Sequence, residues 1–142
     1  RKLYNKALEA GLLPINVISK HSRISSRAKL GKGICVMAGA VINVNCIVSD
    51  GVIVNTNCSI DHDCSIGEFS HIAPGTAISG TTRIGQCTHI GTNCAVIDGI
   101  KIGDNSYIGA GASVVSDIPD NVLAYGVPCR IVKQLEDSRR HI

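Results

Sequence analysis

A strict six-residue repeat of aliphatic side chains runs through most of this chain. Every sixth position from 18 to 114 is Ile, Leu or Val, which makes 17 consecutive positions without an exception. A period of six fits neither the 3.6-residue period of an α-helix nor the alternation of an isolated hairpin. It is typical of hexapeptide solenoids, in which one short strand and one turn recur. The repeat therefore predicts an all-β parallel β-helix over residues 18–114.

Three hexads make one coil of such a solenoid, so residues one coil apart should stack about 4.8 Å from each other. We expect one such ladder to consist of Ile18, Val36, Val54, Ile72, Ile90 and Ile108. The residue after each aliphatic is often small or polar, and we expect these residues to form the turns with positive φ. They are Gly31, Asn43, Asn55, Asp61, Gly67, Gly85, Gly91, Gly103 and Gly109.

Composition excludes several classes of protein. The chain has one Phe, three Tyr and no Trp, so its core has to come from stacked aliphatic side chains. The net charge is +3 with no basic run longer than Arg139-Arg140, which argues against a nucleic-acid or anionic membrane surface. No stretch approaches the roughly 18 apolar residues of a membrane span, and no signal peptide is recognisable. We therefore expect a soluble protein.

The seven cysteines fit a structural role. Cys46, Cys58, Cys64 and Cys94 all lie two residues before a repeat aliphatic, where a small inward side chain is needed. There is no C-x-x-C motif and no Cys/His cluster with zinc-finger spacing. We interpret them as small core residues with reduced thiols, which indicates a cytoplasmic location and no metal site.

Both ends of the chain depart from the repeat. Residues 1–11 predict a short helix with Leu3, Ala7 and Leu8 on one side, ending at Gly11. Residues 115–142 are expected to turn back and cap the open end of the solenoid with a short amphipathic tail. The predicted fold is thus a β-solenoid with short terminal helices. The only Met is Met37, so we expect a fragment or a processed product.

Six stretches are more specific than the repeat alone: 41–43, 55–56, 60–67 (Ile-Asp-His-Asp-Cys-Ser-Ile-Gly), 70–75 (Ser-His-Ile-Ala-Pro-Gly), 107–111 and 125–128. In these stretches the chain resembles the left-handed β-helix acyltransferases, and among them the NeuD/PglD-like sugar O- and N-acetyltransferases. The resemblance implies left-handed coils, a rare exception to the right-handed crossover rule.

The resemblance also implies a domain division. Members of this family usually carry an N-terminal Rossmann-like domain that binds the nucleotide of the sugar substrate. Residues 1–17 would then be the remaining linker and helix of such a domain, which is missing here. Residues 18–114 would be the acetyltransferase domain, and residues 115–142 a C-terminal loop and capping tail.

His62 is the strongest candidate for catalysis among the five histidines. Acetyl transfer from a thioester needs a base for the attacking group, and His has a suitable pKa. His62 lies in a turn between Asp61 and Asp63, and an adjacent carboxylate can orient an imidazole and raise its basicity. The resemblance implies that His62 is the catalytic base and Asp63 the acidic residue that tunes it, where the family often has Glu.

The resemblance assigns further residues to acetyl-CoA. His71 would contact its thioester or pantetheine, and Gly80, Thr92 and Ala110 match positions that contact the cofactor. His89 lies one coil above His71, so the two rings should stack about 4.8 Å apart. We interpret His89 as a wall residue and not as a catalyst.

The function that the resemblance implies is acetyl-CoA-dependent acetylation of a sugar, above all of the amino group of a nucleotide-linked aminosugar in bacterial lipopolysaccharide or capsule biosynthesis. It also implies a homotrimer with the active site between subunits. O-acetylation of a sialic acid is the close alternative.

Two alternatives from other classes stay open. A γ-carbonic-anhydrase-like metalloenzyme pairs two metal-binding His five residues apart, whereas here the spacings are 9 and 18 residues. A catalytically inactive trimeric scaffold would share the repeat and lack the chemistry.

Overall fold

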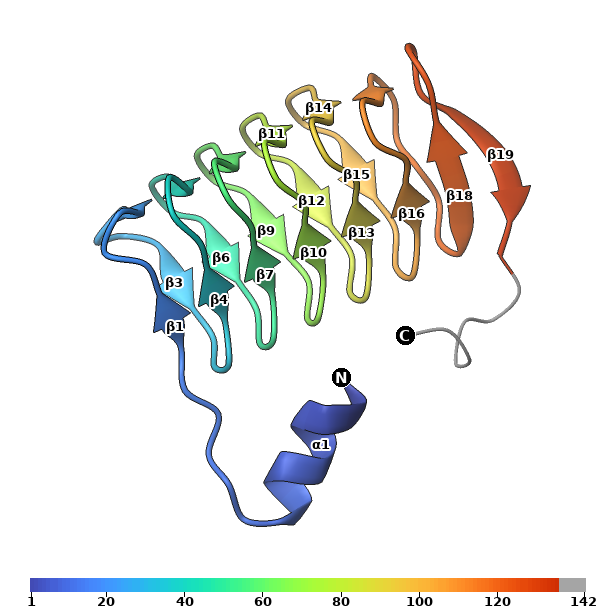
Figure 1. Ribbon diagram of the computed structural model, residues 1–142. Coiled ribbons are helices and arrows are strands. Elements are labelled where there is room, and N and C mark those ends of the chain that lie inside the picture. The colour runs from blue at the N-terminus through green and yellow to red at the C-terminus, as the bar shows by residue number, and fades with distance from the viewer. Residues whose placement is uncertain (136–142) are drawn as a thin grey trace.

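A short helix and a long solenoid make up the described part of the chain (Figure 1). The computed structural model describes residues 1–135, and the remainder of the predicted tail, with Arg139-Arg140 and His141, lies outside the described residues. Helix α1 spans Lys2–Glu9, and 17 two-residue strands follow it at six-residue steps. The parallel β-helix predicted over residues 18–114 is confirmed.

The strands form three sheets, one for each side of the solenoid. Sheet A contains β1 (Val17–Ile18), β4 (Cys35–Val36), β7 (Ile53–Val54), β10 (His71–Ile72), β13 (His89–Ile90), β16 (Tyr107–Ile108), β18 (Val122–Tyr125) and β19 (Arg130–Gln134). Sheet B contains β2 (Arg23–Ile24), β5 (Val41–Ile42), β8 (Ser59–Ile60), β11 (Ala77–Ile78), β14 (Ala95–Val96) and β17 (Ser113–Val114). Sheet C contains β3 (Lys29–Leu30), β6 (Ile47–Val48), β9 (Ser65–Ile66), β12 (Arg83–Ile84) and β15 (Lys101–Ile102).

Parallel pairing sets the register between coils. Ile72 lies opposite Val54 in the coil before it and Ile90 in the coil after it, so the predicted ladder is confirmed. The repeat aliphatics point inward and are buried from Val36 to Val114. The first coil is the exception, because no coil precedes it and the end of the solenoid is open there. Ile18 is 45% exposed.

The small inward position is also buried, as predicted. Cys46, Cys58, Cys64 and Cys94 all lie in the core, and burial raises the pKa of the Cys64 thiol to about 11. A protonated thiol is a poor nucleophile, so these cysteines act as small core side chains. Thr76 occupies the same inward position one coil after Cys58, and its hydroxyl donates to the carbonyl of Gly91 at 2.8 Å.

The predicted position of the positive-φ residues is wrong. Positive φ occurs three residues after the aliphatic, for example at Asn45 (60°) and Asp63 (58°), and not directly after it. The glycines directly after the aliphatic are needed for a different reason. A Cβ on Gly67 would lie 2.5 Å from the backbone nitrogen of Gln86 in the next coil. Small size at that position therefore allows neighbouring coils to approach each other.

Helix α1 is attached to the solenoid through one aromatic side chain. The helix begins and ends close to the predicted positions, but none of its residues is buried, and Leu3 on the predicted apolar side is 81% exposed. Tyr4 makes the contact instead. Its ring packs edge-on against Phe69 with centroids 5.1 Å apart, and its hydroxyl donates to Asp50 Oδ2 at 3.2 Å. The helix therefore lies beside the turns that connect sheet C to sheet A (Figure 1).

The expected second terminal helix does not form within the described residues. In β18, Val122 and Ala124 are buried and alternate with more exposed residues, which suits a strand. This strand continues sheet A beside β16, with Ala124 opposite Ile108, and then pairs with β19 in antiparallel direction.

Residues 1–135 contain no helix that is both long enough and apolar enough to span a membrane.

Replacing a buried aliphatic should cost much more stability than replacing an exposed one in the same sheet. Ile66 is 1% exposed and Ile47, on the outer face of sheet C, is 50% exposed. We expect Ile66→Ala to lower the free energy of unfolding by about 2–5 kcal/mol and Ile47→Ala by less than about 1 kcal/mol. Urea denaturation at one fixed protein concentration measures both. Equal losses would contradict the inward direction of the ladder.

Candidate active site

His62 lies in the turn between β8 and β9, at the corner where the chain passes from sheet B to sheet C. Asp63 takes the left-handed conformation there, with φ of 58°, which Asp tolerates better than most residues. The turn directs His62 outward. The side chains of His62 and Asp63 are 51% and 47% exposed, so a substrate in solution can reach them.

The predicted base and its acidic partner are in direct contact. His62 Nδ1 lies 2.9 Å from Asp63 Oδ2. A carboxylate can only accept, so Nδ1 carries the proton and Nε2 is left as a proton acceptor. The hydrogen bond to Asp63, together with the negative charge of Asp61, raises the pKa of His62 above its ordinary value. This geometry is that of an oriented general base.

The coil before His62 supplies two amides that sequence reasoning missed. Asn43 Nδ2 donates to Asp61 Oδ1 at 2.8 Å, and Asn45 Nδ2 donates to Asp63 Oδ1 at 2.9 Å. The hydrogen bonds from Asn45 and His62 hold the pKa of Asp63 below its ordinary value. The signal for both amides was present in the sequence, because each lies one coil before its partner.

The coil after His62 leaves space for the imidazole. Gly80 lies over the ring, and a Cβ on Gly80 would be 2.6 Å from His62 Cε1 and 2.7 Å from Nε2. A hydrogen atom therefore suits this position and a methyl group does not. The predicted role of Gly80 as an acetyl-CoA contact is a separate matter and stays a prediction.

His71 is held as a neutral hydrogen-bond donor. Its Nε2 lies 3.0 Å from Asn55 Nδ2. The backbone N–H of Thr56 donates to Asn55 Oδ1 at 2.7 Å, so the amide group of Asn55 turns its NH₂ toward the ring. His71 Nε2 therefore accepts and its Nδ1 carries the proton. Burial also lowers the pKa of His71, which favours the neutral ring.

An aromatic column continues from His71 along the outer face of sheet A. The rings of His71 and His89 have centroids 4.9 Å apart, which confirms the predicted spacing, but their planes are 77° apart, so the rings meet edge to face and are not stacked. His89 in turn stacks on Tyr107, with centroids 4.4 Å apart and planes 14° from parallel. The contact of Tyr107 with His89 was not predicted from the sequence, although Tyr107 lies one coil after His89. The column packs His71 from one side and limits its rotation.

The predicted site residues fall on two different edges of the solenoid. His62 and Gly80 lie at the corner from sheet B to sheet C. Thr92 and Ala110 lie at the corner from sheet A to sheet B, next to the strand ends that carry the aromatic column. Sheet B separates the two corners (Figure 1). One chain therefore does not bring the whole predicted set together.

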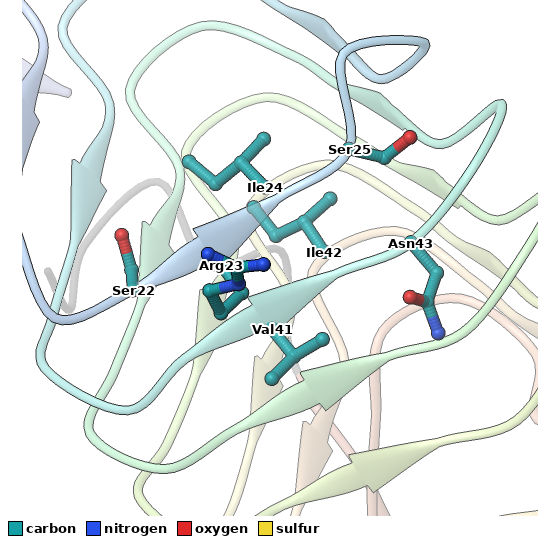
Figure 2. Close-up of a pocket in the computed structure, with 7 residues that line it drawn as sticks. All are labelled: Ser22, Arg23, Ile24, Ser25, Val41, Ile42 and Asn43. Carbon is teal, nitrogen blue, oxygen red and sulfur yellow. The ribbon is translucent and has the colours of Figure 1, made fainter.

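A shallow pocket of about 420 Å³ lies beside the acidic turn. It spans the first two strands of sheet B, and Figure 2 shows its lining residues Ser22, Arg23, Ile24, Ser25, Val41, Ile42 and Asn43. Asn43 is at once a pocket residue and the partner of Asp61. The pocket therefore borders the carboxylate of Asp61, which precedes His62.

No metal centre is evident in the described part of the chain. Within residues 1–135, no three His, Cys, Asp or Glu side chains are grouped closely enough to hold a metal ion. His71 and His89 meet edge to face, with ring centroids 4.9 Å apart.

The fold and the repeat define the chain as a hexapeptide-repeat protein. Residues 81–115 match the family described as bacterial transferase hexapeptide (six repeats). Solved structures match over a much larger part of the chain, and the left-handed form of the β-helix follows from them.

Three of these structures are informative. PerB from Caulobacter crescentus, in complex with CoA and GDP-perosamine, is 39% identical with a TM-score of 0.92, over 93% of this chain and 64% of that one. The acetyltransferase domain of PglB from Neisseria gonorrhoeae is 38% identical with a TM-score of 0.91, over 93% of this chain and 64% of that one. WeeI from Acinetobacter baumannii is 26% identical with a TM-score of 0.90, over 92% of this chain and 64% of that one.

These matches confirm the resemblance to sugar acetyltransferases with a left-handed β-helix. The chain spans 64% of the length of the solved proteins named above.

Adding a methyl group at Gly80 should displace the imidazole of His62. Gly80 has no positive φ, so its backbone suits alanine, and the clash falls on the ring alone. We expect Gly80→Ala to separate His62 from Asp63 and to lower the pKa of His62 toward its ordinary value. An NMR titration of the ring signals measures this shift.

The ring signals of His71 and His89 serve as internal controls and should not move. An unchanged His62 titration in folded Gly80→Ala protein would contradict the contact between Gly80 and the ring.

Proposed function

We propose that this chain is the catalytic part of an acetyl-CoA-dependent sugar N-acetyltransferase, with the amino group of a nucleotide-linked aminosugar as acceptor. The oriented pair of His62 and Asp63 carries the proposal, since it supplies the base that an attacking amine needs. The identity of PerB as a protein bound to CoA and GDP-perosamine supports the choice of cofactor and acceptor. The PglB domain has also been crystallised with acetyl coenzyme A.

The proposed reaction uses the two histidines in different roles. The acceptor nitrogen attacks the thioester carbonyl carbon, and His62 Nε2 takes the proton that the nitrogen loses. His71 donates from Nδ1 to the carbonyl oxygen, where negative charge develops in the tetrahedral intermediate. The C–S bond then breaks, and the proton held by His62 passes to the leaving sulfur of CoA. Thr92, Ala110 and Gly80 would lie along the pantetheine arm.

A neighbouring copy would complete this site. His62 lies at one corner, whereas His71, Thr92 and Ala110 lie on or beside sheet A, across sheet B. A homotrimer in which sheet A of one copy packs near sheet B of the next would bring the two groups together.

The charges on the outer faces support this packing. From the second coil to the sixth, the outward residues of sheet C include the cations Arg83 and Lys101, whereas those of sheets A and B include no Lys, Arg, Asp or Glu. In the first coil, sheets B and C each carry one outward cation, Arg23 and Lys29. On sheet B the outward residues of the later coils are Val41, Ser59, Ala77, Ala95 and Ser113. Uncharged faces are the ones expected at a permanent interface.

Relatives named for N-acetylation favour an amine over the hydroxyl of a sialic acid. A role in bacterial surface glycan biosynthesis and a cytoplasmic location belong to the same proposal.

Removing the base should slow turnover strongly and leave cofactor binding intact. We expect His62→Ala to lower kcat by about 10²–10⁴-fold, the usual contribution of a general base. Release of CoA thiol with a panel of nucleotide-linked aminosugars measures the rate, and calorimetry measures acetyl-CoA binding. His21→Ala, an exposed histidine in another turn, is the control and should be as active as the unchanged protein. Near-normal turnover by His62→Ala, or no acetyl-CoA binding by the unchanged protein, would contradict the proposal.

The pH profile should report the contact with Asp63. The base works only when deprotonated, so activity falls as the pH drops through the pKa of His62, which lies above the ordinary value. Asp63→Asn removes the largest cause of that rise. We expect the acid limb of kcat/KM to move to lower pH.

The plateau of kcat/KM should also fall in Asp63→Asn, because an amide can present either its oxygen or its NH₂ to Nδ1. Asp98→Asn, in the same column of turns as His62, is the matched control for replacing an Asp by Asn. An acid limb that stays in place in Asp63→Asn would show that Asp63 does not set the pKa of His62.

A further inference from the structure

We propose that Asn43 and Asn45 are positioning residues for the base, because they hold both carboxylates beside His62 from the preceding coil. The catalytic meaning of this inference rests on the proposed function, whereas the positioning itself rests on geometry. Neither asparagine touches the imidazole. Each acts on it through an aspartate.

The two amides fix two different parts of His62. Asp61 Oδ1 accepts from Asn43 Nδ2 at 2.8 Å and from the backbone N–H of His62 at 2.8 Å, so this carboxylate ties the His62 backbone to the coil below. Asp63 accepts from Asn45 with Oδ1 at 2.9 Å and from the His62 ring with Oδ2 at 2.9 Å. Backbone and ring are thus held by separate carboxylates.

The second bond to Asp63 matters because the pair is half exposed. The side chains of His62 and Asp63 are 51% and 47% exposed, so water can compete for a carboxylate that is free to rotate. With Oδ1 bound to Asn45, the carboxylate plane is set and Oδ2 faces Nδ1. A group that orients a hydrogen-bond partner in this way favours one tautomer of the imidazole. The result is an Nε2 that is ready to accept a proton.

Neutral amides suit this turn because it already contains two carboxylates, Asp61 and Asp63. The charged groups that act on the pair are Asp61, Asp63 and Arg27, which lies one coil below Asn45. The coil above contributes Gly80 over the ring and the backbone N–H of Thr81, which donates to the carbonyl of His62 at 2.9 Å, and neither residue is charged. A carboxylate in place of Asn45 would repel Asp63 instead of donating to it. An amide donor is therefore the side chain that fits.

The backbone at Asn45 permits a clean test. Asn45 has φ of 60°, a conformation that glycine adopts without strain. Asn45→Gly thus removes the amide and keeps the turn. Asn105→Gly is the matched control, because Asn105 has φ of 52° in a turn on another corner. Thermal melting of both variants checks that they fold.

The first measurement is the ¹⁵N spectrum of the His62 ring. We expect the unchanged protein and Asn105→Gly to show the Nδ1–H tautomer, and Asn45→Gly to show a mixture of both tautomers. A purely structural role for Asn45 would leave the spectrum as it is. An unchanged His62 tautomer in folded Asn45→Gly would overturn the inference.

The second measurement is the rate of acetyl transfer. We expect Asn45→Gly to lower kcat by about tenfold, as is usual for partners that orient an active group, with KM for acetyl-CoA unchanged. If Asn45→Gly does not fold, Asn45→Asp replaces it, and the added carboxylate should also disturb the tautomer. A changed spectrum without any acetyl transfer by the unchanged protein would refute the proposed function and support the positioning. A full rate in Asn45→Gly would overturn the positioning role.

Discussion

Parallel pairing between residues 18 apart is the constraint on which the rest of this structure depends. Each coil repeats the coil before it, so every side chain has a fixed neighbour above and below. The core follows from this register, because inward aliphatics stack on aliphatics and small residues stack on small residues. The candidate site follows from it as well. Asn45 lies below Asp63, Gly80 lies above His62, and three aromatic rings follow one another in contact along sheet A.

The same register separates the chemistry into two groups. A side chain stays on its own sheet or corner along the whole solenoid, so the base at one corner cannot meet the acetyl-CoA contacts predicted at another corner of the same chain. The histidines differ accordingly. His62 is exposed, lies beside two carboxylates and can accept a proton, whereas His71 is half buried, bonded to Asn55 and able to donate. The proposed mechanism needs both an acceptor and a donor, so in that proposal the site is complete only where two copies meet.

Much of this arrangement could be predicted from the sequence, because a period of six fixes which residues point inward and which stack. The buried cysteines, the outward turn at His62 and the placement of His71 one coil from His89 all followed from that period. The location of the positive-φ residues did not, since small residues serve two needs that look alike in a sequence: a left-handed turn at Asn45 and a close approach of coils at Gly67. The docking of α1 through a tyrosine depends on a contact between distant segments, which no local pattern contains.

The most direct test of a site formed between copies is subunit complementation. His62→Ala and His71→Ala chains, each inactive alone, are unfolded together, refolded as a mixture and assayed for acetyl transfer. If a site combines His62 of one copy with His71 of its neighbour, random assembly of equal amounts restores about one quarter of the sites. Each variant refolded alone stays inactive. A mixture that is as inactive as the separate variants would contradict the account, because it would mean that both histidines act within one chain.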